Sequence, residues 1–288
     1  MTVEFFNGFY FMYVILGVAT FLGLYFFLRN KSFRFKKNAV GIILLLNLVL
    51  HFLKLNFAPY SLNPDKAMRD VWFINVCAMS VVTFPLYYYI KSKSAKDFMF
   101  YLGVISGFLA FLIPTEALGE NPFLFDVIRF YICHFIIIAG PLLMIVLGIH
   151  KLDYKRIPKV PLYMALTLIL IAFQQVLQYE LGIINLRSTD FFEHKVHNPS
   201  LIWGPSSELA VLFTIFTPNF MKVVPYGEFI GQDKYWPFFY MLPGVLVYFT
   251  VLPLLISLPW QYKQIKIDVK NTYLFVKDKT KKVIKART

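Results

Sequence analysis

Polar residues within apolar stretches are the part of this sequence that could carry chemistry. Cys77 bears a thiol and His134 bears an imidazole, and each lies inside an apolar run. The thiolate is the reactive form of cysteine, and a nearby histidine can take up the thiol proton, so the two could form a nucleophile and its base. Asn75, Arg129 and His51 are further polar residues in such runs. We take these residues as the candidate site.

The same residues have simpler explanations, which stay open at this point. A single buried cysteine is usually a small packing residue, and a single histidine on an apolar face more often makes a structural hydrogen bond. Asp126 and Arg129 are three positions apart and could neutralise each other. The sequence has no HExxH or CxxC spacing, so it predicts no metal site. It also has no P-loop, GxGxxG or GxSxG motif.

The composition indicates that these residues lie in a membrane protein. Of the 288 residues, 58% are hydrophobic and only 16% are charged, whereas soluble domains average roughly 25% charged residues. The net charge of +13 could suggest a nucleic-acid partner. However, the basic residues form short clusters between apolar runs, which is typical of cytoplasmic loops. We therefore predict a membrane and no nucleic acid as the environment of this chain.

The apolar runs predict an all-α membrane protein with about seven transmembrane helices, because each crossing needs about 20 mainly apolar residues. Residues 1–262 would form the seven-helix domain and residues 263–288 a basic cytoplasmic tail. Residues 179–236 are too long for a simple loop and are expected to form an outer-side insertion, as a re-entrant element, a lid or an ordered loop. The predicted spans are residues 9–28, 39–58, 71–90, 99–118, 124–149, 160–178 and 237–260.

The distribution of Lys and Arg predicts the orientation of these spans. Alternate loops, at residues 29–37, 91–96 and 151–159, are rich in Lys and Arg, as is the tail. The positive-inside rule then places the N-terminus outside and the C-terminus in the cytoplasm, which requires an odd number of spans. In this arrangement His51, Cys77 and His134 all lie in the outer half of the membrane. We therefore expect one hydrated cavity that opens outward.

Residues 71–148 resemble the YwaF-like bacterial integral membrane proteins, which are similar to a eukaryotic transmembrane phospholipid fatty-acyltransferase family. The shared pattern is a cysteine in the third span, a glycine-rich fourth span that ends near a proline, and a fifth span with two aromatic residues before a histidine and a later proline. Asn75 stands where the family has a histidine, and residues 187–234 look like an insertion. The matching residues are Cys77, Gly103, Gly107, Pro114, Phe130, Tyr131, His134 and Pro141.

This resemblance implies acyl transfer through a thioester, with no cofactor. Cys77 would attack an acyl ester of a phospholipid or another acyl lipid, and His134 would deprotonate first Cys77 and then the acceptor. Asn75 and Ser80 would orient the thiol or stabilise an oxyanion, and Arg129 would hold a phosphate. Hydrolysis of a lipid ester is a close variant of the same chemistry. The resemblance also implies a bacterial plasma membrane.

Two other classes of function remain open from the sequence, and His51 is a further candidate for substrate binding in any of them. In a transporter or channel, the same polar residues would line a substrate pathway, although the absence of a visible repeat argues mildly against this class. In a non-catalytic subunit of a membrane protein complex, the basic tail and the insertion would be docking elements. Such a subunit would tolerate changes at Cys77.

Overall fold

The computed structural model describes residues 1–184, 198–205, 210–227 and 230–285. Most of these residues are helical and none of them forms a strand, which confirms the prediction of an all-α protein. The helices are α1 (Gly8–Leu28), α2 (Phe33–Leu53), α3 (Pro64–Asp70), α4 (Val76–Tyr89), α5 (Lys93–Leu112), α6 (Phe125–Val146), α7 (Val160–Glu180), α8 (Ala210–Thr214) and α9 (Leu242–Lys285).

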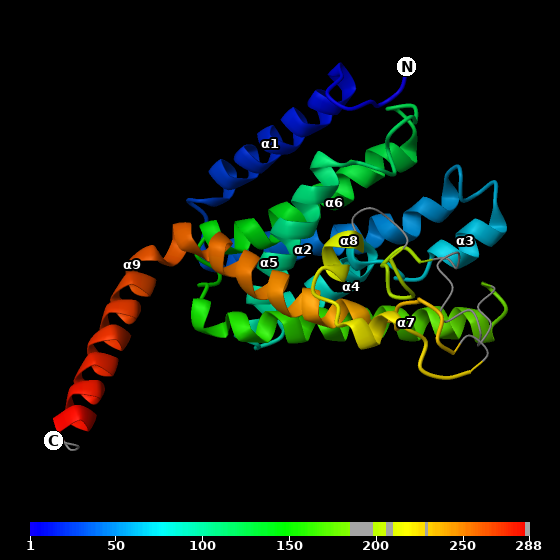
Figure 1. The fold of residues 1–288 in the computed structure, drawn as a ribbon. Coiled ribbons are helices and arrows are strands. Elements are labelled where there is room, and N and C mark those ends of the chain that lie inside the picture. Colours follow the sequence, from blue (N-terminus) through cyan, green and yellow to red (C-terminus); the bar gives the residue numbers. More distant parts are fainter. Residues whose placement is uncertain (185–197, 206–209, 228–229, 286–288) are drawn as a thin grey trace.

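The long helices lie side by side in one bundle, which the chain traverses back and forth (Figure 1). Within the described residues, six helices are long and apolar enough to cross a membrane, and α4 is a shorter apolar helix in the same bundle. Together they match the prediction of about seven spans, and they make the protein an integral membrane protein. Its orientation and its location in a bacterial plasma membrane stay predictions.

Helix α4 is shorter than the predicted span because its helix begins at Val76 and not at Val71. The side chain of Asn75 caps α4 by accepting a hydrogen bond from the backbone N–H of Ala78 at 2.6 Å. The 14 residues of α4 extend about 21 Å at about 1.5 Å per residue, less than the hydrocarbon core of about 30 Å. The chain therefore enters this end of the bundle as a non-helical linker, residues 71–75.

Polar side chains from the C-terminal end of α2 and from α7 satisfy the backbone of this linker and of the end of α3. Backbone groups without partners are costly where water is excluded, so a non-helical segment at this depth needs such partners. Gln174 and Gln178 of α7 serve this purpose. The carbonyls of Arg69, Asp70, Val71 and Phe73 bond to Gln178 (2.6 Å), Lys54 (2.7 Å), His51 (2.9 Å) and Gln174 (3.3 Å), respectively.

Helices α5 and α6 pack closely through glycines. A Cβ atom at Gly103 would lie under 3.0 Å from the backbone oxygen of Ile137, and one at Gly107 would meet the side chain of Ile138. Small residues allow helix backbones to approach in membranes, where packing and not water exclusion drives helix association. The glycines of the fourth span therefore hold α5 against α6, the helix that carries His134.

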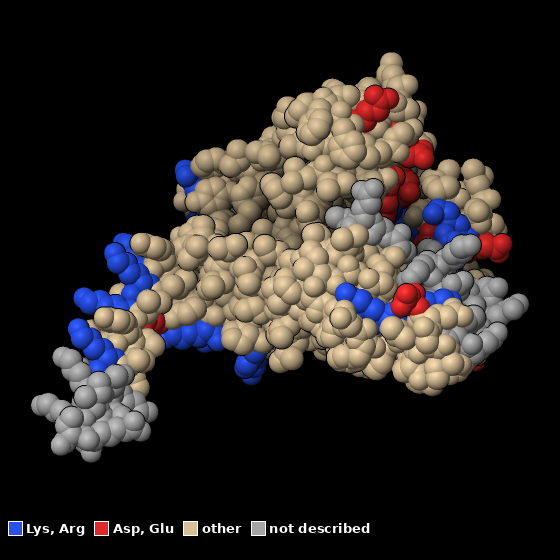
Figure 2. All heavy atoms as spheres, viewed as in Figure 1, with Lys and Arg blue, Asp and Glu red and all other residues tan. Residues whose placement is uncertain are grey.

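The two ends of the bundle differ in the charged side chains that they carry (Figure 2). We call the end with residues 29–37, 90–93, 147–159 and the part of α9 after Trp260 the basic end. The opposite end, with residues 54–75 and 113–124, is called the cavity end. At the basic end, the fully buried Asp97 accepts from Arg156 (3.0 Å from Nη2 to Oδ1) and lies 2.7 Å from His150 Nε2, which ties α5 to the segment after α6.

Helix α9 runs without a break across the boundary predicted between the last span and the basic tail. Its 44 residues extend about 66 Å along the helix at about 1.5 Å per residue, so it crosses the bundle and continues beyond the other helices, with a bend where it leaves them (Figure 1). Within the predicted insertion, α8 packs against α9, since the Tyr248 hydroxyl donates to the Leu212 carbonyl at 2.9 Å. The insertion also includes residues 185–197, 206–209 and 228–229, which lie outside the described residues.

Candidate functional site

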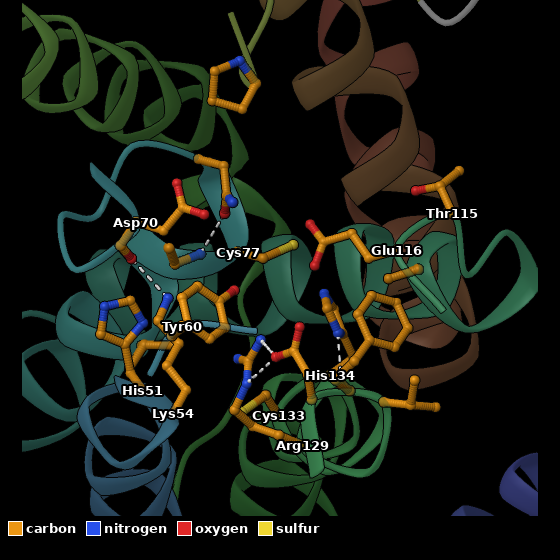
Figure 3. Close-up of a pocket in the computed structure, with 18 of the residues that line it drawn as sticks. His51, Lys54, Tyr60, Asp70, Cys77, Thr115, Glu116, Arg129, Cys133 and His134 are labelled. Carbon is orange, nitrogen blue, oxygen red and sulfur yellow. Dashed lines mark hydrogen bonds and ion pairs between the residues drawn. The ribbon is translucent and has the colours of Figure 1, made fainter. Parts of the chain in front are cut away.

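A cavity of about 910 Å³ lies between α2, α4, α5 and α6 at the cavity end. A volume of this size falls within the range of binding sites for small molecules. Each predicted site residue lines it: His51, Asn75, Cys77, Arg129 and His134. The sequence predicted that His51, Cys77 and His134 lie in the same half of the membrane, and the structure brings them to one cavity (Figure 3).

Cys77 lies in the first turn of α4, as the second residue of the helix. Asn75 caps this turn, but the first backbone N–H groups of any helix have no acceptor within the helix. The N–H groups of Val76 and Cys77 are in that position, and the N-terminus of a helix favours negative charge. Cys77 is half-buried and lines the cavity. A nucleophile and a set of possible oxyanion donors therefore occupy the same helical turn.

The imidazole of His134 has a fixed tautomer. Its Nδ1 lies 2.8 Å from the backbone carbonyl of Phe130, one turn earlier in α6. A carbonyl oxygen only accepts hydrogen bonds, so Nδ1 carries the proton and the neutral ring keeps its lone pair on Nε2. Within the described part of the chain, Nε2 has no hydrogen-bond partner. The basic nitrogen of His134 is therefore available on the cavity side.

Arg129 is paired with Asp126 in the first turn of α6, as the spacing of the two residues suggested. Its Nε and Nη2 donate to one carboxylate oxygen of Asp126, at 2.9 and 2.6 Å. Arg129 lines the cavity, and a guanidinium has five donors. The pair neutralises the charge of Arg129 without using all of its hydrogen-bonding capacity, so an anionic group of a ligand can still be bound there.

His51, Asn75 and Ser80 have backbone partners. Nε2 of His51 donates to Val71, as described above, and its ring stacks on Phe73 with centroids 4.6 Å apart. The Ser80 hydroxyl donates to the Val76 carbonyl at 2.8 Å, is buried, and does not line the cavity. His51 and Asn75 therefore build the wall of the cavity, and their roles in binding a substrate stay predictions.

Glu116 is a cavity residue to which the sequence interpretation gave no role. It follows the end of α5, and its carboxylate lies beside the Cys77 sulfur and the His134 ring (Figure 3). Burial by surrounding protein raises the pKa of the Glu116 carboxyl, whereas the nearby Arg129 acts to lower it. An acidic residue at the end of an apolar run was the signal for this position. Glu116 adds an acid–base group to the thiol and imidazole.

Lys54 is a second such residue, and it directly follows the last residue of α2. Its side chain is buried, its ammonium lies 5.0 Å from the centre of the Tyr60 ring, and both residues line the cavity. Lys54 and Arg129 are two of the cationic side chains that line the cavity, together with Lys66 and Arg69. In the described parts of the chain, no group of three or more His, Cys, Asp or Glu residues is arranged to hold a metal ion.

Comparison with known proteins identifies the family of the chain. The model of the TMEM164 family, a family of transmembrane proteins, matches residues 5–217. Searches of curated proteins and of solved structures give no match. The family match does not test the resemblance to YwaF-like proteins. It contains α1 to α8 and all the site residues described above, and it covers 213 of 288 residues. The protein therefore belongs to the TMEM164 family.

Proposed function

We propose that the protein is a membrane-embedded lipid acyltransferase, or a lipid ester hydrolase, that works through a thioester on Cys77. The observation that carries the proposal is the shared cavity of the Cys77 thiol and the His134 imidazole, whose Nε2 is free to accept a proton (Figure 3). The cavity lies within a bundle of helices that are apolar enough to cross a membrane. In the surrounding membrane, phospholipids are the most abundant esters. A thiol and a neutral imidazole together are the minimum set for nucleophilic acyl transfer.

The first half of the reaction forms the thioester. His134 Nε2 accepts the thiol proton of Cys77, and the sulfur attacks the carbonyl carbon of the lipid ester. The oxyanion of the tetrahedral intermediate lies near the free N–H groups at the start of α4. When the intermediate collapses, the C–O bond breaks, and His134 returns the proton to the leaving alkoxide. A lysolipid is released and the acyl group stays on Cys77.

The second half transfers the acyl group. His134 accepts a proton from a hydroxyl or amine of the acceptor, whose oxygen or nitrogen attacks the thioester carbon. The C–S bond then breaks and the thiolate regains the proton from His134. If water is the acceptor, the same steps hydrolyse the ester. Glu116 lies beside the imidazole, where a carboxylate would stabilise the imidazolium that forms in each half.

The other cations of the cavity would bind the lipid. Arg129 and Lys54 line the same cavity as Cys77, and a phosphate is a good partner for both guanidinium and ammonium groups. Apolar side chains, such as Val81, Leu109 and Ile137, also line it and provide contacts for an acyl chain. A phospholipid can therefore bind with its phosphate near Arg129 and its ester near Cys77.

The chain contains a matched control for testing this proposal. Cys133 is the other cysteine, it is also free, and it lines the same cavity. The full-length protein, Cys77→Ala and Cys133→Ala would be incubated with phospholipid and measured by intact-protein mass spectrometry. We expect wild type and Cys133→Ala to gain a fatty-acyl mass that hydroxylamine removes, and Cys77→Ala to gain none. His134→Ala should keep the thiol but acylate at least roughly 100-fold more slowly, as is typical for loss of a general base.

Four outcomes would contradict the proposal. Acylation of Cys77→Ala would assign the adduct to another residue. A wild-type protein that takes up no acyl group, and whose Cys77 fails to react with a thiol probe, would leave this cysteine with a packing role. Flux of a substrate into liposomes, without a covalent intermediate, would instead favour the transporter class. Full complementation of a null strain by Cys77→Ala would favour the role of a non-catalytic subunit.

A further inference from the structure

A second cavity, of about 930 Å³, lies at the basic end of the bundle. None of the residues of the proposed acyl-transfer site lines it. It is formed by the start of α5, the segment from Ile149 to Arg156, and the part of α9 from Pro259 to Gln264. We call it the basic pocket. Basic side chains from all three elements line it: Lys93, Lys151, Lys155, Arg156 and Lys263.

Carboxylates neutralise two of these cations but leave three lysines unpaired. Asp268 binds Lys155 at 2.8 Å, and Arg156 is paired with the buried Asp97 and with Asp153. In contrast, Lys93, Lys151 and Lys263 form no ion pair within the described residues. These three come from three separate elements, so their convergence on one cavity is a result of the tertiary fold. Three like charges around one cavity repel one another unless an anion is bound between them.

The segment that carries Lys151 is held rigidly. Arg156 Nη2 donates to the Lys151 carbonyl at 2.9 Å, and the backbone N–H of Tyr154 donates to Oε1 of Gln261 on α9 at 2.8 Å. The Tyr154 hydroxyl also donates to Asp268 at 2.6 Å. Because these bonds fix both walls of the basic pocket, little ordering is required when a ligand binds.

Gln261 provides an independent indication of a missing acceptor. Its Oε1 accepts from Tyr154, but its buried Nε2 has no acceptor within the described residues. Buried polar groups in proteins are nearly always hydrogen-bonded, so a donor of this kind requires an explanation. Gln261 lines the basic pocket, and an oxygen of a bound anion would supply the acceptor.

We propose that the basic pocket binds a phosphate group, with Lys93, Lys151 and Lys263 as its cationic ligands and Gln261 as a neutral donor. Lysine ammonium groups bind phosphate as point charges. The exposed side chains of Trp260 and Tyr262 lie beside the pocket, and such aromatic residues are typical of the headgroup level of a membrane. The phosphate group belongs either to an anionic phospholipid of this leaflet or to a soluble phosphate compound.

The test compares lysines inside and outside the pocket. One variant of the full-length protein carries Lys93→Gln, Lys151→Gln and Lys263→Gln. Its matched control loses the same charge at three exposed lysines of the basic end that do not line the pocket: Lys159→Gln, Lys266→Gln and Lys270→Gln. Each protein would be placed in nanodiscs of phosphatidylcholine with a small fraction of phosphatidic acid. Native mass spectrometry would then release the protein from the nanodisc and identify the lipid that stays bound to it.

We expect wild type and the matched control to retain more phosphatidic acid than phosphatidylcholine, relative to the composition of the nanodisc. In the pocket variant, the ratio of retained phosphatidic acid to phosphatidylcholine should fall by roughly tenfold or more, because charge-assisted hydrogen bonds are stronger than neutral ones. A second arm titrates glycerol 3-phosphate into protein in neutral detergent. Binding of the lipid alone identifies a headgroup as the ligand, and saturable binding of glycerol 3-phosphate identifies a soluble phosphate. Equal losses in the pocket variant and its control, or no preference in wild type, would overturn the proposal.

This site is independent of the acyl-transfer proposal, and the same experiment can separate the two. Cys77→Ala should retain phosphatidic acid at the basic pocket as wild type does, because Cys77 lies at the opposite end of α4 from the basic end. Conversely, the pocket variant should still form the thioester on Cys77. Thermal unfolding followed by tryptophan fluorescence should be unchanged in the pocket variant, since its three lysines are exposed.

Discussion

The contact between α5 and α6 makes a sharp prediction about stability and about the site. In Gly103→Ala, the new methyl group would lie under 3.0 Å from the backbone oxygen of Ile137, 3.0 Å from Pro141 and 3.2 Å from Phe84. The nearest of these atoms belongs to the main chain of α6 and cannot turn away as a side chain does. The two helices must therefore move apart.

The size of the effect follows from this geometry. Ordinary contacts of a Cβ atom begin at 3.4 Å, so the backbones must separate by more than 0.4 Å (3.4 minus 3.0). The side chains of α5 around Gly103 are fully buried, Phe100 and Leu102 among them, and a close-packed interior does not absorb such a shift without loss of contacts. Overpacking of this kind costs about 1–3 kcal/mol. We expect the upper part of this range because the obstacle is backbone.

The assay is equilibrium unfolding of the purified protein in mixed micelles, with two glycine variants for comparison. Gly23 in α1 has no atom within 4 Å of its Cβ position, so Gly23→Ala should not destabilise the protein and should raise the free energy of unfolding by up to about 1 kcal/mol through helix propensity. At Gly140, the obstacle is the end of the flexible Leu44 side chain, so Gly140→Ala should cost less than Gly103→Ala. If Gly103→Ala unfolds like Gly23→Ala, then α5 and α6 do not approach as closely as described.

Two further predictions concern buried charge and the cavity. Asp97→Asn should destabilise the protein by about 3–5 kcal/mol, because Arg156 loses its buried partner. Asp153 is a more exposed partner of Arg156, so Asp153→Asn should cost at most about 1 kcal/mol. Equal midpoints of the two variants in thermal unfolding would refute this difference. Glu116→Gln should slow acyl transfer to Cys77 by roughly tenfold or more, with unchanged thermal unfolding. The measurement is the rate of thioester formation. A variant that forms the thioester as fast as wild type would show that Glu116 has no part in the mechanism.

Local sequence was enough to predict the class of fold. Length and apolarity identify a membrane helix without knowledge of its neighbours, because lipid forces each crossing segment to satisfy its own backbone. The alternation of basic loops was enough to group the polar residues at one end. His51, Cys77 and His134 were expected at that end on these grounds, and they do line one cavity.

The start of α4 shows where local sequence was not enough. Residues 71–75 are apolar enough to continue the helix, yet they are non-helical in the structure. They are held there by side chains far away in the sequence, such as Gln174, which is 101 residues from Phe73. A glutamine in an apolar run is only a polar residue until its partner is known. Only the structure shows that Gln174 supports this linker.

For the chemistry of the site too, some features followed from the sequence and others only from the tertiary structure. The sequence by itself determined which groups are present, a thiol, an imidazole and a guanidinium, and the membrane that surrounds them, because these follow from residue types and from apolar length. Only the tertiary structure decided that residues 71–75 leave the helix, which puts Cys77 in its first turn, and that Glu116 lies beside Cys77 and His134. Likewise, it alone gathered three unpaired lysines into the basic pocket. Each of these depends on contacts between distant segments, which form only when the helices pack.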